Sequence, residues 1–155
     1  MSAPWRVLCA ALLLTPLACH AKEPATVAPS GLMQVPLQIT TAAGQTHRFT
    51  VEIAATEAQQ ERGLMFRTSL APDAGMIFPM GPPRFASFWM KNTLIPLDLL
   101  FIRANGQIAR IAANARPFSL TPIDSGEPVA AVLELAGGRA AALGIREGDR
   151  VVLNP

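Results

Sequence analysis

The segment from Ser87 to Ile102 constrains the fold of this 155-residue chain more than any other part of the sequence. It contains two mostly apolar stretches on either side of a turn at Pro96, and it places one acid, Asp98, within the second stretch. Such stretches predict two β-strands. Because an unpaired buried carboxylate is costly, Asp98 must be paired, hydrogen-bonded or protonated. The segment is therefore predicted to form the core of a small β-rich domain, the wall of a binding pocket, or both.

Short strand patterns continue on both sides of this segment. Residues 33–41 and 47–54 alternate between apolar and polar side chains, and the turn at 43–45 predicts that they form a hairpin. Further strands are predicted at residues 76–78, 85–91, 97–103, 108–112 and 129–135, and residues 145–153 predict a turn followed by a closing strand.

Two short helices are predicted between these strands. Thr56 and Gln59 have the spacing of a capping box, which predicts a helix over residues 57–65 that Gly63 interrupts. A single helical turn is predicted over residues 139–143. About eight short strands with two short helices predict a mainly β fold, a β-rich α+β domain shaped as a small, partly closed β-barrel.

Local turn signals set the expected boundaries between strands. Asn105 and Gly106 predict a type I′ hairpin turn. Pro79 is expected to end a strand, and residues 80–84 are expected to form an irregular loop. Residues 114–127 hold two prolines and predict a long loop, which is a candidate lid or rim.

The first residues have the pattern of a secretory signal. Arg6 is the only charge before an apolar run, and small residues follow that run. We favour a cut before Cys19, which would make residues 1–18 the signal and Cys19 a site of lipid attachment. A cut after Ala21 would instead release a soluble periplasmic protein. An uncleaved anchor is a third hypothesis, but the apolar stretch is short for a spanning helix.

Composition then limits what the remaining chain can do. Residues 19–32 predict a flexible tether, and residues 33–155 predict a single β-rich domain without cysteine. A disulfide scaffold, a thiol nucleophile and a cysteine-based metal site are therefore excluded from this domain. The two histidines are far apart in sequence, and the net charge of the chain is only +2. We expect no metal, no cofactor and no nucleic-acid partner, and we expect a monomer.

Five short motifs occur in a fixed order in residues 33–155. Together they resemble the bacterial and archaeal domain-of-unknown-function 192 family over nearly the whole of this domain. The resemblance implies a compact β-rich domain, often exported, and it implies no established activity. The motifs are Gly63–Arg67, Gly75–Phe78, Phe88–Thr93, Pro96–Phe101 and Val132–Gly137.

Trp89 and Lys91 are the only tryptophan and lysine of residues 33–155. The strand phase predicts that Phe88 and Met90 point one way and that Trp89 and Lys91 point the other way. A desolvated lysine can act as a base or bind an anion. The alternative is a surface lysine whose stem covers Trp89.

Asp98 and Glu134 are the acids most embedded in apolar strands. One hypothesis is a polar cluster with Lys91, Arg62 or Arg67 that lines a cleft. The other is a structural role, either as an ion pair or as a carboxylate that accepts hydrogen bonds from loop N–H groups, and we favour this for Asp98.

Taken together, these observations predict a binding or accessory module of the cell envelope, located in the periplasm and lipid-anchored to a membrane if Cys19 is acylated. An aromatic wall with cations and carboxylates suits a small anionic or sugar-like ligand. Two alternatives remain: a hydrolase or lyase that uses Lys91 with Asp98 or Glu134 as acid and base, and a purely structural envelope protein. The candidate ligand-binding residues are Arg62, Arg67, Trp89, Lys91, Asn92, Thr93, Asp98 and Glu134.

Overall fold

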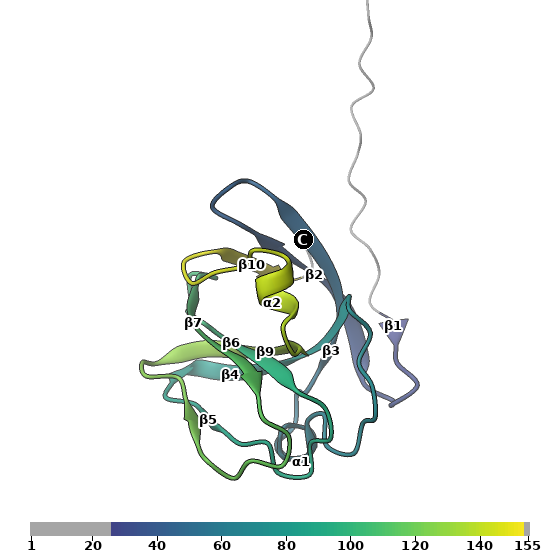
Figure 1. The fold of residues 1–155 in the computed structure, drawn as a ribbon. Coiled ribbons are helices and arrows are strands. Elements are labelled where there is room, and N and C mark those ends of the chain that lie inside the picture. Colours follow the sequence, from purple (N-terminus) through teal and green to yellow (C-terminus); the bar gives the residue numbers. More distant parts are fainter. Residues whose placement is uncertain (1–25, 154–155) are drawn as a thin grey trace, which may run out of the picture.

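A computed structural model describes residues 26–153 of the chain (Figure 1). The predicted signal, the two cleavage sites, Cys19 and residues 19–25 of the predicted tether lie outside the described residues. Residues 26–153 contain ten strands and two short helices. No helix in this range is both long and apolar enough to cross a membrane.

Eight of the ten strands belong to one curved sheet. Its order is β1-β2-β3-β4-β9-β6-β7, and β10 pairs with β2 off this path. Their bounds are β1 Thr26–Val27, β2 Met33–Thr40, β3 Thr46–Ile53, β4 Ala74–Arg84, β6 Leu97–Ile102, β7 Ile108–Ala115, β9 Val129–Ala136 and β10 Arg150–Leu153.

The sheet curls toward closure without completing a barrel. Its two distant strands, β2 and β7, approach each other through β10, which pairs with β2 and forms an isolated bridge from Arg150 to Gln107. The Ile108 N–H adds a hydrogen bond to the Asp149 carbonyl. The predicted partly closed, β-rich fold is confirmed in this form (Figure 1).

The other elements lie at the ends of this sheet. Strands β5 (Ser87–Phe88) and β8 (Ile123–Asp124) form a separate two-stranded sheet. Helix α1 covers Glu57–Arg62 and helix α2 covers Arg139–Ala142. In Figure 1 the two helices lie on opposite sides of the central strands β4, β9 and β6, with α2 beside β10 and α1 at the lower end of the molecule.

Local signals were reliable where a few neighbouring residues decide the structure. Strands β2 and β3 form the predicted antiparallel hairpin. The capping box is confirmed, with Thr56 accepting from the Gln59 N–H and the Gln59 side chain accepting from the Thr56 N–H. Helix α1 ends earlier than expected, because Gly63 adopts a positive φ of 47°.

The expected strand end at Pro79 was wrong. Strand β4 continues to Arg84, with a register shift between Pro79 and Arg84. The parallel pairing of β3 with β4 stops at Ile77, so β4 has only one strand partner beyond that point. A proline, which lacks an N–H, is tolerated where one side of a strand is unpaired.

The strand predicted over residues 85–91 is also shorter than expected. Only Ser87 and Phe88 pair with another strand, and Asn92 turns the chain with a positive φ of 56°. The predicted alternation nevertheless holds, because Met90 is buried while Trp89 and Lys91 are exposed.

The predicted type I′ turn was wrong, although the hairpin between β6 and β7 is present. Gly106 has a positive φ of 84°, but Asn105 does not have the positive φ that this turn type requires. Instead, the Asn105 carboxamide oxygen accepts from the Gln107 N–H at 3.0 Å, which stabilises the turn without a left-handed asparagine.

The sheet separates two hydrophobic cores. The α2-side core includes Leu37, Leu100, Leu133 and Val151. The α1-side core includes buried residues of the same central strands that point the opposite way: Met76, Phe78, Leu97, Leu99, Phe101 and Val132. The side chains of each central strand therefore point alternately into the α2-side core and the α1-side core. A polar side chain on such a strand must lie in one of these two apolar cores.

Candidate functional site

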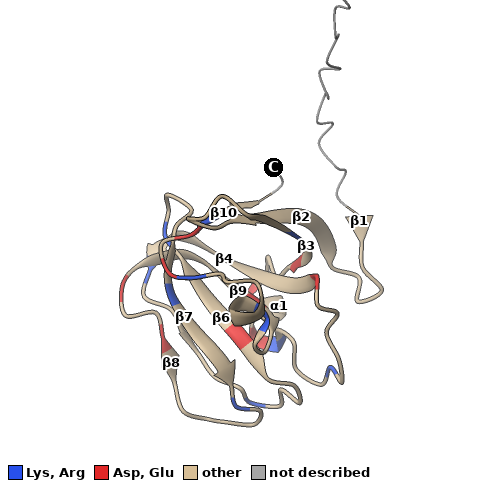
Figure 2. Ribbon diagram, turned by 45° about the horizontal axis from the view of Figure 1, so that its top comes forward, with Lys and Arg blue, Asp and Glu red and all other residues tan. Residues whose placement is uncertain are grey.

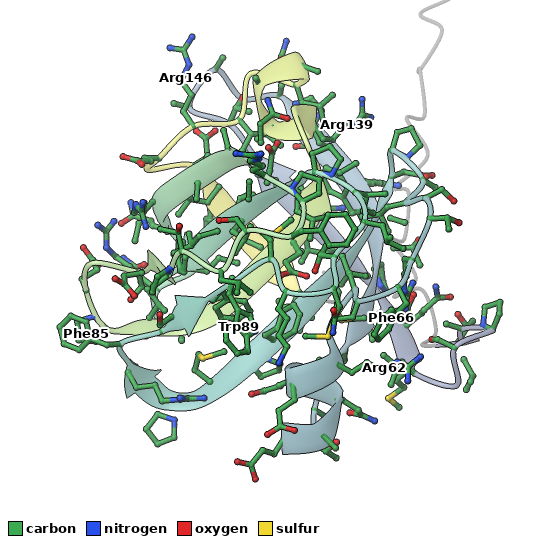
Figure 3. The ribbon with its side chains drawn as sticks, turned by 60° about the horizontal axis from the view of Figure 1, so that its bottom comes forward. Arg62, Phe66, Phe85, Trp89, Arg139 and Arg146 are labelled. Carbon is green, nitrogen blue, oxygen red and sulfur yellow. The ribbon has the colours of Figure 1, made fainter. Side chains whose placement is uncertain are left out.

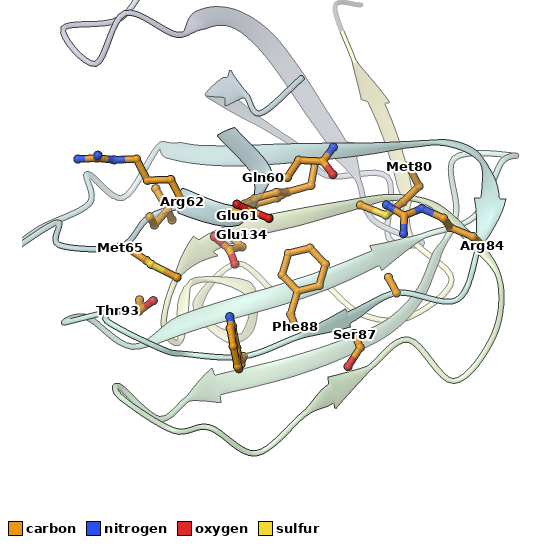
Figure 4. Close-up of a pocket in the computed structure, with 15 residues that line it drawn as sticks. Gln60, Glu61, Arg62, Met65, Met80, Arg84, Ser87, Phe88, Thr93 and Glu134 are labelled. Carbon is orange, nitrogen blue, oxygen red and sulfur yellow. The ribbon is translucent and has the colours of Figure 1, made fainter. Parts of the chain in front are cut away.

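A pocket of about 230 Å³ lies on the α1 side of the sheet, between α1, β4 and the segment around β5 (Figure 4). Helix α1 begins at its capping box and ends at Gly63, which lies beside the Phe78 ring of β4 and lines the pocket. The apolar lining comes from Leu64, Met65, Phe78, Met80, Phe88 and Trp89.

Aromatic rings form the most ordered part of this lining. The Phe88 ring packs edge-on against Phe78 at a centroid distance of 5.1 Å and against Phe101 at 6.5 Å. These contacts hold Phe88 in place although it belongs to a two-residue strand. Trp89 adds a half-exposed wall at the opening. The pocket therefore offers rigid apolar surface to a ligand.

Glu134 is the acid that reaches this hollow from the sheet. It lies on central strand β9, opposite Met76 of β4 and Leu99 of β6, and it is only 5% exposed. Among residues 26–153, no side-chain hydrogen bond or ion pair involves its carboxylate. In Figure 4 the carboxyl group points into the space between Met65 and Phe88.

Burial raises the pKa of Glu134 to about 8. The carboxyl is therefore mostly protonated and neutral near pH 7, because a charged carboxylate without a partner is poorly solvated there. A protonated carboxyl has one O–H donor and can still accept hydrogen bonds. The base of the pocket thus presents a neutral hydrogen-bonding group on an apolar floor.

Charged and polar side chains surround the opening. Arg62 and Glu61 come from the end of α1, and Arg84 comes from the end of β4. All three are exposed. The remaining polar lining residues are Gln60, Ser87 and Thr93.

Four of the eight predicted ligand-binding residues line this pocket. They are Arg62, Trp89, Thr93 and Glu134, and they come from three parts of the chain: the end of α1, the segment after β5, and strand β9. Thr93 is buried, and its hydroxyl donates to the Lys91 carbonyl at 3.3 Å, so it also stabilises the turn. The other four predicted residues do not line the pocket: Arg67, Lys91, Asn92 and Asp98.

Arg67 is engaged in a structural ion pair. Its guanidinium forms two hydrogen bonds with Glu52, at 2.6 and 2.7 Å, and the Ser30 hydroxyl also donates to Glu52 at 2.6 Å. Burial by itself would raise the pKa of Glu52, but the hydrogen bonds from Arg67 and Ser30 outweigh it and hold the pKa below its usual value. This ion pair joins the loop after α1 to β3.

Lys91 and Asn92 lie in the turn next to the pocket but do not line it. The Lys91 ammonium group is 5.0 Å from the centre of the Trp89 ring, as expected for a surface lysine that covers this side chain. The Asn92 carbonyl accepts a hydrogen bond from the Phe66 N–H at 2.9 Å. Both residues support the wall that carries Trp89.

Asp98 faces away from the pocket. It alternates along β6 with Leu97 and Leu99, which belong to the α1-side core, so its carboxylate lies on the α2 side of the sheet. It is fully buried and accepts hydrogen bonds from the backbone N–H groups of Asn114, Gly138 and Ala140, at 2.8 to 2.9 Å. The hydrogen-bonded role favoured for this acid agrees with this geometry.

The predicted acid–base arrangement is therefore not assembled. Lys91 lies over Trp89 outside the hollow, Asp98 is on the other face of the sheet, and only Glu134 reaches the pocket. Within residues 26–153, no group of three or more His, Cys, Asp or Glu side chains could hold a metal ion.

Sequence reasoning missed Phe78, Phe88, Met80 and Arg84 as pocket residues. Phe78 and Phe88 looked like ordinary core positions in an apolar strand pattern. Met80 and Arg84 fell in the expected irregular loop, and their place in the wall depends on the continuation of β4 past Pro79. The available signal was Met80 itself, a large apolar residue between Pro79 and Gly81.

Comparisons with other proteins support a family assignment. The family profile described as DUF192, "Uncharacterized ACR", matches residues 38–153. Two crystal structures are similar. A protein of unknown function from Novosphingobium aromaticivorans has 47% identity and a TM-score of 0.81, covering 89% of this chain and 98% of that one. A protein from Sinorhizobium meliloti described as a candidate transcription regulator has 48% identity and a TM-score of 0.78, covering 79% and 95%. No curated protein gave a match.

Proposed function

The chain belongs to the DUF192 family, whose description names no activity, and from the pocket around Glu134 we propose that it is a small-ligand-binding module. The ligand is a small hydroxylated or anionic molecule, such as a sugar or a sugar acid. It would place an apolar ring face against Phe88 and Trp89, and it would hydrogen-bond to Glu134.

The observation that carries this proposal is the isolated Glu134 carboxyl at the base of an open pocket. It is 5% exposed, lies among apolar neighbours, and has a pKa of about 8. Above the ordinary pKa of 4.5, this acid lowers the stability of the empty protein. The folded state must either keep the carboxyl protonated or hold a poorly solvated charge, whereas the unfolded state ionises freely. A ligand that hydrogen-bonds to this group would remove part of that cost.

The protonation of Glu134 defines the ligand class. In its neutral form the carboxyl donates to a hydroxyl, carbonyl or carboxylate oxygen. Arg62 and Arg84 at the opening add positive charge that favours an anion, although Glu61 offsets part of it. A cationic ligand would bind the ionised carboxylate better than the neutral carboxyl, and it would have to pass these two arginines.

Binding of probe compounds tests the proposal. Titration calorimetry with glucuronate, glucose and ethylammonium compares an anionic sugar, a neutral sugar and a cation. We expect glucuronate or glucose to bind below pH 8 and to bind more weakly above it, as Glu134 loses its donor proton. Binding of ethylammonium alone, with an affinity that rises above pH 8, would overturn the assigned ligand class.

Three substitutions make this test specific. Glu134→Gln keeps a hydrogen-bond donor, so this variant should bind the sugar with an affinity that does not change near pH 8. Glu134→Leu has no hydrogen-bonding group and should not bind the sugar. Glu57→Gln, at an exposed acid on α1 that does not line the pocket, is the matched control and should behave as the unchanged protein. Equal binding by the Glu134→Leu variant and the unchanged protein would contradict a role for Glu134.

We further propose that this module acts in the cell envelope, exported by the signal pattern before Cys19 and anchored by a lipid on that cysteine. Labelling of the expressed chain with palmitate tests the anchor. Incorporation that disappears in Cys19→Ser supports it, whereas an unlabelled protein recovered from the periplasm supports the cut after Ala21.

A further inference from the structure

Three loops beside the pocket opening join into one surface, which we call the three-loop tip: residues 64–70, 89–96 and 116–121. The Phe66 N–H donates to the Asn92 carbonyl at 2.9 Å, and the Phe118 N–H donates to the Thr93 carbonyl at 3.2 Å. The Met90 N–H adds a third bond, to the Ser119 carbonyl at 2.9 Å. The middle loop is thus hydrogen-bonded to both of the others.

Large apolar side chains project from all three loops into solvent. Phe66 and Phe118 are each 60% exposed, Leu120 is 63% exposed, and Trp89 is 50% exposed. Figure 3 turns this end of the molecule forward and labels Phe66 and Trp89. Large apolar side chains that are grouped on a solvent-exposed surface are typical of an interaction site.

The backbone holds two of these rings outward in a conformation that L-residues rarely adopt. Phe66 has a φ of 65° and Phe118 a φ of 62°, and the N–H of each forms one of the bonds to the middle loop. Uncommon backbone conformations persist only where the surrounding structure determines them, and they often occur at functional sites. The exposure of both rings is therefore fixed by the fold.

The charges of the tip have one sign. Its three loops contain Arg67, Lys91 and Arg116 and no aspartate or glutamate. Arg67 is neutralised by Glu52, but Lys91 lies over the Trp89 ring and Arg116 is exposed. Elsewhere acidic and basic positions are spread over several strands and loops (Figure 2). The tip combines aromatic rings with nearby cations and lacks an acid.

We propose that the three-loop tip docks on the surface of a bilayer that contains anionic lipid. Phe66, Trp89 and Phe118 would enter the interface, where aromatic rings are favoured, while Lys91 and Arg116 would face the phosphate groups. The positive charge of the tip favours an anionic bilayer over a zwitterionic one, and its exposed aromatic rings suit the bilayer interface. The proposal rests on these loops alone and requires neither a pocket ligand nor acylation of Cys19.

Trp89 provides a local probe of this docking. The chain has two tryptophans, so Trp5→Phe in the full chain leaves Trp89 as the only one. Its fluorescence is followed with vesicles of phosphatidylcholine alone and of phosphatidylcholine mixed with phosphatidylglycerol. We expect a shift to shorter wavelength, and quenching by brominated lipid, with the mixed vesicles only. Because the signal comes from Trp89, contact made by the N-terminal residues does not mimic it.

Substitutions at the tip should weaken this response. Phe66→Ser and Phe118→Ser should each weaken vesicle binding by about tenfold, as expected from the loss of one inserted ring, and Arg116→Gln should weaken it at low salt more than at high salt. Phe85→Ser is the matched control, since Phe85 is 69% exposed and lies outside the tip. Thermal melting checks that each variant folds.

Three outcomes would overturn the proposal: an unchanged Trp89 spectrum with mixed vesicles, an equal response to phosphatidylcholine alone, or a response that survives loss of both phenylalanines. Crosslinking of the tip to an envelope protein, without a vesicle response, would assign this surface to a protein partner instead.

Discussion

Two buried carboxylates lie on neighbouring central strands and face opposite sides of the same sheet. Asp98 points to the α2 side and accepts three backbone N–H groups. Glu134, one residue away in the register between β6 and β9, points to the α1 side and has no hydrogen-bond partner among the described residues. The same sequence pattern, one acid in an apolar strand, therefore produces a structural anchor in one case and an unpaired acid in the other.

The difference arises from what covers each face. Above Asp98, Gly138 adopts a positive φ of 79° and directs the first N–H groups of α2 toward the carboxylate. Above Glu134, the chain has stopped α1 at Gly63 and leaves a pocket. Burial alone does not distinguish a structural acid from one that is available to a ligand. The hydrogen-bond partners of the carboxylate make that distinction.

Removing the Asp98 carboxylate should have the largest effect. Asp98→Ala leaves three backbone N–H groups without their acceptor, and we expect the free energy of unfolding to fall by about 3–5 kcal/mol. Urea denaturation measures this loss. Asp73→Ala, at an exposed acid, is the control and should change little. A loss below about 1 kcal/mol would mean that loop waters replace the carboxylate and that the contrast with Glu134 is weak.

Neutralising Glu134 should have the opposite sign. Its pKa of about 8 in the folded protein lies above the ordinary value of 4.5, so the folded state holds a proton that the unfolded state has lost. Stability contributed by this group therefore falls as pH rises from about 4.5 to 8, by up to roughly 1.4 kcal/mol per pH unit.

Glu134→Gln removes this dependence and should stabilise the protein by a few kcal/mol at pH 8 and above, where the wild-type acid is ionised. Unfolding measured from pH 5 to 9 checks the slope against the unchanged protein. If the free energy of unfolding has the same pH dependence in the Glu134→Gln variant and in the unchanged protein, Glu134 is hydrated or paired in solution.

Glu52 is an intermediate case, because a side chain pairs it rather than the backbone. Arg67→Met should lower the free energy of unfolding by about 1–3 kcal/mol at pH 7, because Glu52 stays largely buried and keeps only the Ser30 hydroxyl as a partner. The pKa of Glu52 is lowered in the folded protein, so the stability contributed by the pair is present above the unfolded pKa and is lost as pH falls through the folded pKa. The penalty of the substitution should therefore shrink under acidic conditions.

The surface pair of Arg103 and Glu127 should have the smallest effect. Its atoms are 2.6 Å apart, yet both side chains are substantially exposed. Exposed ion pairs are screened by water and salt, so Glu127→Gln should leave the melting temperature nearly unchanged. A clear drop would show that geometry outweighs solvent exposure in this protein.

Sequence reasoning recovered features that depend on a few adjacent residues. The β2–β3 hairpin, the Thr56 capping box and the alternation around Trp89 follow from local patterns. It failed where a distant segment decides the result. Strand β4 can continue through Pro79 because its pairing with β3 ends at Ile77. The sequence of β4 alone does not show where that pairing ends.

The candidate site shows the same division. The sequence identified Glu134 and Trp89 by their unusual settings, and both line the pocket. It could not place Asp98 and Glu134 on opposite faces, since that depends on the register in which Leu99 pairs with Glu134. Nor could it show that Glu52 would bind Arg67, because the two residues meet only after the chain has turned around α1.

The alternation of β9 also has a consequence for how the chain reaches its native state. Leu133 and Leu135 point to one core while Val132 and Glu134 point to the other. Sliding β9 by one residue between β4 and β6 would exchange these faces. Glu134 would then enter the sealed α2-side core, and two leucines would fill the hollow. The acid thus makes misaligned assembly of the central strand unfavourable, whether or not a ligand is ever present.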